Sequence, residues 1–129
     1  MALHTKSFQA RFAPLVADGR KRQTIRQRKI GKPAPELGDT IWCVGENMSQ
    51  TLGKWPITEV LPITIHLHGG RVVLNDIYPV EGDDLERFAQ QDGFTCAADM
   101  LQWFREQYAG LELFEGDVIG WHAMEGAAV

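Results

Sequence analysis

The sequence predicts an α+β fold, in which a small mixed or mainly antiparallel sheet or barrel is flanked by helices. Segments with the composition of strands outnumber those with a helical pattern. The strand segments are joined by short turns such as Gly69-Gly70, and no long helical crossover separates them. The length of 129 residues fits a single domain, residues 1–129, that can bury a core without disulfides or metals.

The first elements surround a basic segment. Apolar spacing predicts a short amphipathic helix over Phe8 to Val16, which Pro14 limits to one or two turns and Asp18-Gly19 ends. A short strand is predicted over Gln23 to Arg28 because Thr24, Arg26 and Arg28 alternate with Ile25. Both predictions place the basic residues of this region at the end of a helix and the start of a strand.

The remaining elements follow from turn signals and periodicity. In the first part we expect a loop over Gly31 to Gly38, a strand over Thr40 to Val44 and a polar loop over Gly45 to Gly53. After it we expect a long strand over Lys54 to His68, bent at Pro56 and Pro62, and a partner strand over Arg71 to Leu74. In the second part we expect a connection over Asn75 to Glu81, followed by two helices. The first is capped by Asp83 or Asp84 and ends at Gln91, and the second is capped by Thr95 and ends near Tyr108. After them we expect a turn over Glu115 to Asp117, a strand over Val118 to Met124 and a frayed tail over Glu125 to Val129.

Positive charge is concentrated in one stretch of the chain. Seven of the 13 Lys and Arg residues lie between Arg20 and Lys32, and no Asp or Glu occurs from Gly19 to Pro35, although the net charge is −4. The segment therefore creates a local positive field that the net charge conceals. A solvated surface would explain it, and so would a site for an anionic partner such as RNA.

Several function classes are disfavoured. The two cysteines, Cys43 and Cys96, form no Cys-x-x-Cys pair, so a cysteine zinc site is not expected. His66 and His68 share a strand face but have no evident third ligand, so we expect neither a metal ion nor a cofactor. Without an apolar leader or a membrane-length apolar run, the sequence predicts a reduced, cytoplasmic protein with no membrane partner.

A set of short motifs resembles the ASCH-domain family, a branch of the PUA-like β-barrels. The motifs are Gly19-Arg20-Lys21 with Thr24-Ile25-Arg26, Gly38-Asp39, Asp92-Gly93-Phe94 and a final strand ending near Trp121. They occur in the family order over most of the chain. The resemblance implies a single ASCH domain with a PUA-like fold. The best characterised activity in the family is hydrolysis of the acetyl amide of N(4)-acetylcytidine, and other members are thought to bind or cut RNA.

The resemblance also implies site residues. The small amidohydrolases of the family use a lysine, a threonine and an acidic residue, which by motif fall on Lys21, Thr24 and Asp92. Asp92 stands where those enzymes carry a glutamate, so its side chain is one methylene shorter. The implied function is removal of an acyl group from N(4)-acetylcytidine or a related nucleoside. The alternative is a module that binds RNA, and a further form of this alternative is that it also cleaves RNA.

The chemistry of these side chains sets two conditions. A Thr24 hydroxyl needs a base, and Lys21 can act as one only if burial or neighbouring cations lower its pKa from about 10.4. Residues three apart in a strand point to opposite faces, so Lys21 can meet Thr24 only from the turn before the strand.

The other members of the basic segment have simpler expected roles. Arg26 shares a face with Thr24 and could hold a substrate oxygen, and Arg20 and Arg28 are further expected substrate-binding residues. Structural roles remain open for two of the candidates, because Thr24 is a good strand former and Asp92 precedes a helix-ending glycine. The four tryptophans, Trp42, Trp55, Trp103 and Trp121, are expected in the core or in pocket walls.

Overall fold

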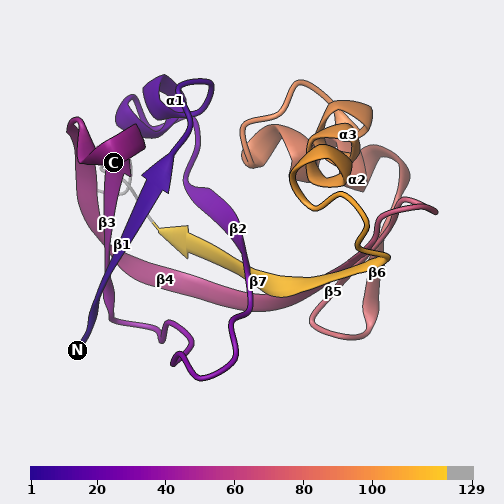
Figure 1. The fold of residues 1–129 in the computed structure, drawn as a ribbon, viewed down its shortest axis with the longest axis horizontal. Coiled ribbons are helices and arrows are strands. Elements are labelled where there is room, and N and C mark those ends of the chain that lie inside the picture. The colour runs from indigo at the N-terminus through magenta and orange to yellow at the C-terminus, as the bar shows by residue number, and fades with distance from the viewer. Residues whose placement is uncertain (122–129) are drawn as a thin grey trace.

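A computed structural model describes residues 1–121 of the chain. Its strands are β1 (Leu3–Phe8), β2 (Gln23–Gln27), β3 (Thr40–Gly45), β4 (Thr51–His66), β5 (Arg71–Leu74), β6 (Tyr78–Val80) and β7 (Leu113–Trp121). Its helices are α1 (Ala13–Ala17), α2 (Gly82–Gln91) and α3 (Ala97–Gln107), with a short 3₁₀ turn η1 (Glu46–Met48). Strand β4 runs the length of the molecule, with α1 near one end and α2 and α3 near the other (Figure 1).

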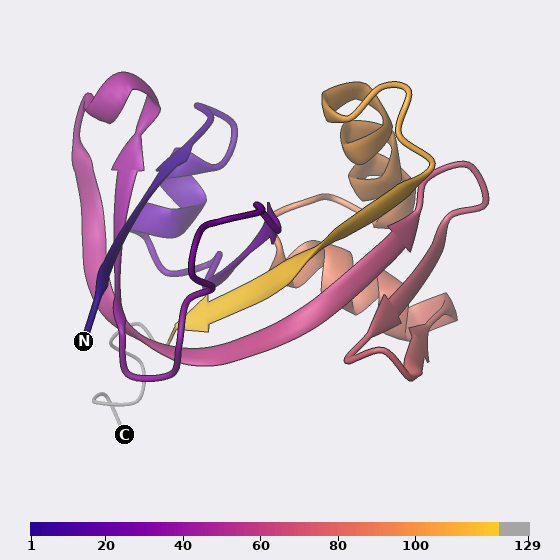
Figure 2. The ribbon, with the colours of Figure 1, turned by 60° about the horizontal axis from the view of Figure 1, so that its bottom comes forward.

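The seven strands form one mixed sheet. β1 pairs with β3 in parallel, and β3 with β4, β4 with β5 and β7, β5 with β6, and β2 with β7 are antiparallel. The sheet is strongly curved, and its hydrogen-bonded ladders do not run all the way round (Figure 2). The predicted α+β class with a mainly antiparallel sheet and flanking helices is therefore confirmed.

The curvature has a cause in the sequence of β4. Its first part pairs with β3 as far as Pro56, and its second part pairs with β7 from Ile57 onward. The register shifts between Ile57 and Glu59, where the ladder is irregular. Proline cannot donate to a ladder and a bulge bends its strand, so β4 turns where it changes partner. The long bent strand predicted over Lys54 to His68 thus exists, displaced by two or three residues.

The Gly38-Asp39 turn ties the start of β1 to the loop before β3. The buried Asp39 carboxylate accepts hydrogen bonds from the backbone nitrogens of Ala2 and Glu36 and pairs with His4 Nε2 at 2.8 Å. These contacts, first among them the Ala2 N–H, lower the pKa of Asp39 to about 2. Gly38 itself takes a φ of 89°, which a residue with a side chain rarely adopts.

Three of the predicted boundaries in the N-terminal half are wrong. Phe8 closes strand β1 and the helix begins only at Ala13, so the apolar residues from Phe8 to Val16 belong to two elements. The segment Leu3–Phe8 is a strand that the sequence pattern does not predict, and its partner β3 lies far away in the sequence. The expected loop over Gly45 to Gly53 contains η1 and the beginning of β4.

The C-terminal half brings further corrections. The connection from Asn75 to Glu81 contains the short strand β6. The cap of α2 is Glu81 and that of α3 is Cys96, neither of them through a side-chain hydrogen bond. The turn predicted over residues 115–117 lies inside β7, which starts at Leu113. The predicted strand end at residues 122–124 and the predicted tail at residues 125–129 lie outside the described residues.

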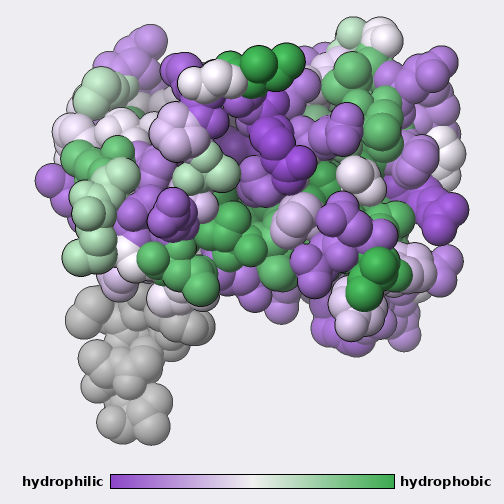
Figure 3. Space-filling model, turned by 90° about the horizontal axis from the view of Figure 1, so that it is seen from below, coloured by the Kyte–Doolittle hydropathy of each residue, from purple (hydrophilic) through white to green (hydrophobic). Residues whose placement is uncertain are grey.

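The surface carries scattered apolar groups. The large exposed hydrophobic side chains of the described part are Met1, Leu3, Ile30, Leu37, Met48, Ile77, Tyr78 and Leu113. On the face in Figure 3, hydrophobic residues form several groups that hydrophilic residues separate. No helix within residues 1–121 combines the length and the apolar character needed to cross a membrane.

Candidate active site

Strand β2 carries the motif residues into the middle of the molecule. It pairs with β7 from Gln23, opposite Gly120, to Gln27, opposite Gly116. Lys21 lies in the turn before β2, where its backbone N–H donates to the Leu15 carbonyl at 2.9 Å. Gly19, with a φ of 85°, allows the chain to reverse between α1 and this turn. The turn position that Lys21 requires in order to approach Thr24 is therefore present.

A cavity of about 270 Å³ opens between β2, the end of β1, the residue before α1, the segment that follows α2, and α3. Its aromatic wall is formed by Phe8, Phe12, Phe94, Trp103, Phe104 and Tyr108. Its polar groups come from Ser7, Gln9, Lys21, Thr24, Arg26, Glu46, Asp92 and Gln107. Apolar walls with a few converging polar groups are typical of small-molecule sites. The cavity thus brings together Lys21, Thr24, Asp92 and Arg26.

Lys21 and Asp92 form a buried pair. Their side chains are only 3% and 5% exposed, and Lys21 Nζ lies 3.4 Å from Asp92 Oδ1. Nζ also donates a hydrogen bond to the backbone carbonyl of Asp92. On its other side Nζ lies 5.1 Å from the ring centroid of Phe12 and 5.9 Å from that of Phe8. The amine is therefore held between a carboxyl group and two aromatic rings.

Burial pushes both members of this pair toward their neutral forms. It lowers the pKa of Lys21 from its ordinary value of 10.5, against the opposing attraction of the Asp92 carboxylate, and Arg26 lowers it further. Burial raises the pKa of Asp92, against the opposing effects of Lys21 and of a hydrogen bond from Gln23. The required lowering of the Lys21 pKa thus arises mainly from burial, and of the neighbouring cations Arg26 is the one that adds to it.

Thr24 is oriented by Arg26. The Thr24 hydroxyl, on a side chain that is almost fully buried, accepts a hydrogen bond from Arg26 Nε at 3.0 Å. Arg26 Nη2 donates to the Ser7 carbonyl at 2.8 Å, and its guanidinium lies 4.8 Å from the centroid of the Phe8 ring. Because Thr24 Oγ1 accepts from a cation, negative charge on this oxygen would be stabilised. Within residues 1–121 no hydrogen bond joins it directly to Lys21 Nζ.

Asp92 reaches the cavity because α2 ends there. It is the C-terminal cap of α2, with its N–H bonded to the carbonyls of Phe88 and Ala89, and Gly93 follows with a φ of 96°. A Cβ at Gly93 would lie 3.0 Å from Lys21 Cδ and 3.1 Å from the Phe12 ring. The glycine therefore serves both the helix end and the close approach of the Lys21 stem.

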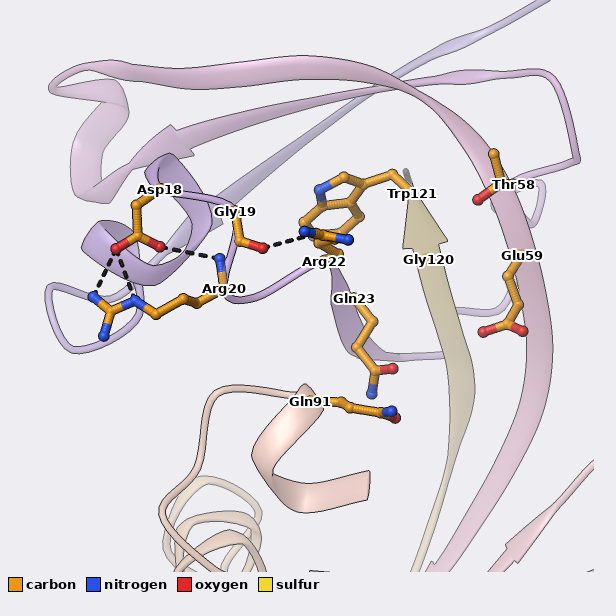
Figure 4. A pocket seen from close by; sticks show the side chains of 10 residues that line it. All are labelled: Asp18, Gly19, Arg20, Arg22, Gln23, Thr58, Glu59, Gln91, Gly120 and Trp121. Carbon is orange, nitrogen blue, oxygen red and sulfur yellow. Dashed lines mark hydrogen bonds and ion pairs between the residues drawn. The ribbon is translucent and has the colours of Figure 1, made fainter. Parts of the chain in front are cut away.

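Arg20 and Arg28 lie outside this cavity. Arg20 binds Asp18 through both its backbone nitrogen and its guanidinium, and Arg28 pairs with Asp117 at 2.9 Å. Arg20 lines a second, larger cavity of about 700 Å³ on the far side of β2, together with Arg22, Gln23 and Glu59 (Figure 4). The structure thus brings Arg26 to the predicted site, whereas Arg20 and Arg28 pair with acidic residues outside it.

Some residues of the site were not identified from the sequence. Gln23, which lines the larger cavity, donates from Nε2 to Oδ1 of Asp92 in the smaller one at 3.3 Å. Ser7 and Phe8 reach the site through the unpredicted strand β1. Of the tryptophans, Trp103 lines the cavity, and its indole N–H donates to Gln9 Oε1 at 3.1 Å. Trp121 lies in the core, and the partly buried Trp55 stacks on it.

Comparisons with known proteins bear on the fold. By sequence, neither a family model nor a curated protein matches the chain. By structure, it is similar to the ASCH domain of Lactobacillus crispatus, with 16% identity, 94% of this chain and 81% of that chain covered, and a TM-score of 0.60. It is also similar to ASCH from Zymomonas mobilis, with 16% identity, 94% and 67% coverage and a TM-score of 0.55. A mutant form of the Zymomonas protein, in which a tyrosine is replaced by phenylalanine, has 15% identity and a TM-score of 0.57, with 95% of this chain and 70% of that chain covered.

Proposed function

We propose that this chain, which has the ASCH-domain fold that its motifs predict, is an amidohydrolase that removes the acyl group from N(4)-acetylcytidine or a related N(4)-acylated nucleoside. The observation that carries the proposal is the shared cavity of Lys21, Thr24 and Asp92, in which burial lowers the pKa of the amine. A hydroxyl nucleophile, a neutral base and an adjacent cation are what amide hydrolysis requires.

In the proposed reaction Thr24 Oγ1 attacks the carbonyl carbon of the acyl group while the neutral Lys21 amine takes the hydroxyl proton. The tetrahedral intermediate collapses with cleavage of the bond between the acyl carbon and N4. Lys21 gives its proton to N4, so that cytidine leaves and the acyl group remains as an ester on Thr24. Water then attacks this ester with Lys21 again as base, which releases the carboxylic acid and restores Thr24. The Arg26 guanidinium, bonded to Thr24, stabilises the negative charge that develops on the reacting oxygens.

Asp92 and the aromatic wall have supporting roles in this proposal. Asp92 holds the Lys21 amine through both its carboxyl and its backbone oxygen, which fixes the direction of the lone pair. The side chain is shorter than glutamate, and the close approach of α2 at Gly93 brings it within 3.4 Å of the amine. The aromatic side chains provide flat surfaces for a pyrimidine ring and exclude water from the reacting groups.

Release of cytidine from N(4)-acetylcytidine tests the proposal. We expect turnover by the wild-type protein, a loss of about 10³-fold or more in kcat for Thr24→Ala, and partial retention for Thr24→Ser, which keeps a hydroxyl. Thr58→Ala is the matched control, because Thr58 is exposed on β4 and faces the other cavity. Absence of turnover, or equal turnover in Thr24→Ala and the wild type, would refute the assignment.

The alternative of an RNA-binding or RNA-cleaving module rests on the basic segment. Two of its expected phosphate contacts, Arg20 and Arg28, are engaged by Asp18 and Asp117. The motif residues Lys21 and Thr24 line a small cavity with aromatic walls, which suits one base better than a continuous strand. Shortening of RNA that depends on Lys21, without release of cytidine from N(4)-acetylcytidine, would favour the alternative.

A further inference from the structure

Gln9 is a polar residue of the cavity wall to which the proposed reaction assigns no role. It directly follows β1, and its side chain is partly buried. Its backbone carbonyl accepts hydrogen bonds from the N–H groups of Phe12 at 2.9 Å and Ala13 at 3.0 Å. These two bonds close the turn that leads into α1, so the backbone of Gln9 is held in place.

The side chain of Gln9 is held as well, by Trp103 of α3. Trp103 Nε1 donates to Gln9 Oε1 at 3.1 Å, and both residues line the cavity. The indole packs edge-on against the rings of Phe12, Phe94 and Phe104, with centroid distances of 5.8, 5.7 and 4.9 Å. Because three neighbouring rings restrain the indole, the direction of its N–H group is restrained too.

The bond to Trp103 decides which way round the Gln9 amide lies. An amide side chain has an oxygen that accepts and an NH₂ group that donates, whereas an indole nitrogen can only donate. The oxygen must therefore face Trp103, and the NH₂ group takes the other position. Within residues 1–121 this NH₂ group has no hydrogen-bond partner, and it is accessible rather than buried. Gln9 thus offers the cavity two N–H donors of fixed orientation.

The place of these donors indicates which part of a ligand would meet them. Thr24 and Lys21 border the cavity from β2 and the turn before it, whereas Gln9 borders it from the junction of β1 and α1. A base whose acyl group lies at Thr24 presents its other polar atoms to other walls. Cytosine carries a ring carbonyl, O2, on the second ring atom from the carbon that bears N4. A carbonyl oxygen accepts, and among aromatic side chains an unmet donor is costly, so the match would discriminate between ligands.

We propose that Gln9 is a specificity-determining residue whose side-chain NH₂ group donates to the ring carbonyl O2 of the cytosine base. The inference rests on the proposed function for the placement of the acyl group. It narrows the substrate class to N(4)-acylated pyrimidines that carry a carbonyl at position 2. Trp103 acts here through Gln9, as a positioning residue that keeps the NH₂ group directed toward the base.

Calorimetric binding of cytidine and 2-thiocytidine tests this inference without any need for turnover, because sulfur is a weaker hydrogen-bond acceptor than oxygen. We expect the wild-type protein to bind cytidine about tenfold more tightly than 2-thiocytidine. Gln9→Met removes the donor with little change in volume, so it should bind the two ligands equally, within about twofold. Gln9→Glu keeps an oxygen toward Trp103 but turns the second oxygen toward O2. Its preference should disappear, and it should bind cytidine about tenfold more weakly than the wild type does.

Two further variants separate this role from general effects on the site. Gln27→Glu adds the same negative charge at an exposed position at the end of β2, outside both cavities, and should keep the preference for cytidine. Trp103→Phe keeps an aromatic ring but removes the indole donor. The Gln9 amide can then turn round, and the preference should shrink to about threefold. An undiminished preference in Trp103→Phe would overturn the role assigned to Trp103.

Equal affinity of the wild type for the two ligands, absence of binding by both, or a preference that persists in Gln9→Met would overturn the inference. Hydrolysis of N(4)-acetylcytidine without any preference for cytidine over 2-thiocytidine would overturn the inference alone. A preference that depends on Gln9, without hydrolysis of N(4)-acetylcytidine, would refute the proposed function alone.

Discussion

Lys21→Met should lower kcat/KM for hydrolysis of N(4)-acetylcytidine by about 10⁴-fold or more, because the variant loses the base that activates Thr24 and protonates the leaving nitrogen. Methionine keeps most of the apolar stem of Lys21, which packs against Phe12 and Gly93. Binding of cytidine should therefore be nearly unchanged. The measurement is a steady-state assay beside calorimetric binding, with Lys54→Met as the control for loss of one positive charge.

The same substitution should not destabilise the protein when Asp92 is neutralised with it. Both partners are buried, and replacing a buried pair by neutral groups of similar shape is often neutral or stabilising. Burial of the charged Lys21 amine lowers the free energy of unfolding, and this loss is complete below the folded-state pKa of Lys21. The loss decreases as pH rises above that pKa and has disappeared above the unfolded value of 10.5. The stability of Lys21→Met/Asp92→Asn relative to wild type should thus be greatest near neutral pH and should shrink toward pH 10.5. Retained hydrolysis, or a double variant much less stable than wild type, would contradict this view of the pair.

Gly116→Ala should destabilise the fold by about 3 kcal/mol or more, because no space exists for a side chain between β2 and β7. A Cβ at Gly116 would lie 2.3 Å from the backbone oxygen of Arg26 and 2.8 Å from the Phe114 ring. Backbone cannot move aside as a flexible side chain can. The substitution would push β2, with Thr24 and Arg26, away from β7.

The free energy of unfolding from urea titration measures this effect. Gly69→Ala is the matched control, since a Cβ there meets no atom within 4 Å and the residue has no positive φ. Its change should stay within about 0.5 kcal/mol, as for most surface substitutions. Equal transition midpoints for Gly116→Ala and Gly69→Ala would show that the two strands are not as closely packed as described.

The site was more predictable than the elements around it, for a physical reason. Lys21, Thr24 and Arg26 lie within six residues, and a turn followed by a strand is enough to aim them into one region. Asp92 could be added only through the family resemblance, since its contact with Lys21 joins segments 71 residues apart. The sequence could not show which arginines are left to bind a substrate, because Arg28 pairs with Asp117, which is distant in the chain.

The missed strands depend on partners that are distant in the chain. β1 alternates between exposed and partly buried residues, with Phe8 alone buried, and it becomes a strand by pairing with β3 across the loop that Asp39 anchors. Residues 115–117 have the composition of a turn, yet pairing with β2 and β4 holds them extended. In both cases tertiary contacts outweigh the local preference of the sequence.

The protonation state of Lys21 is the point on which the account depends, and a titration of the labelled lysine amine by NMR measures it directly. We expect Lys21 to titrate below the ordinary value of 10.5, and we expect this lowering to persist in Thr24→Ala, because burial is its main cause. We also expect kcat to rise with pH through the same value, because the base must lose its proton. A Lys21 that titrates at or above 10.5 would mean a permanently charged ion pair with Asp92, and this site would then have no base.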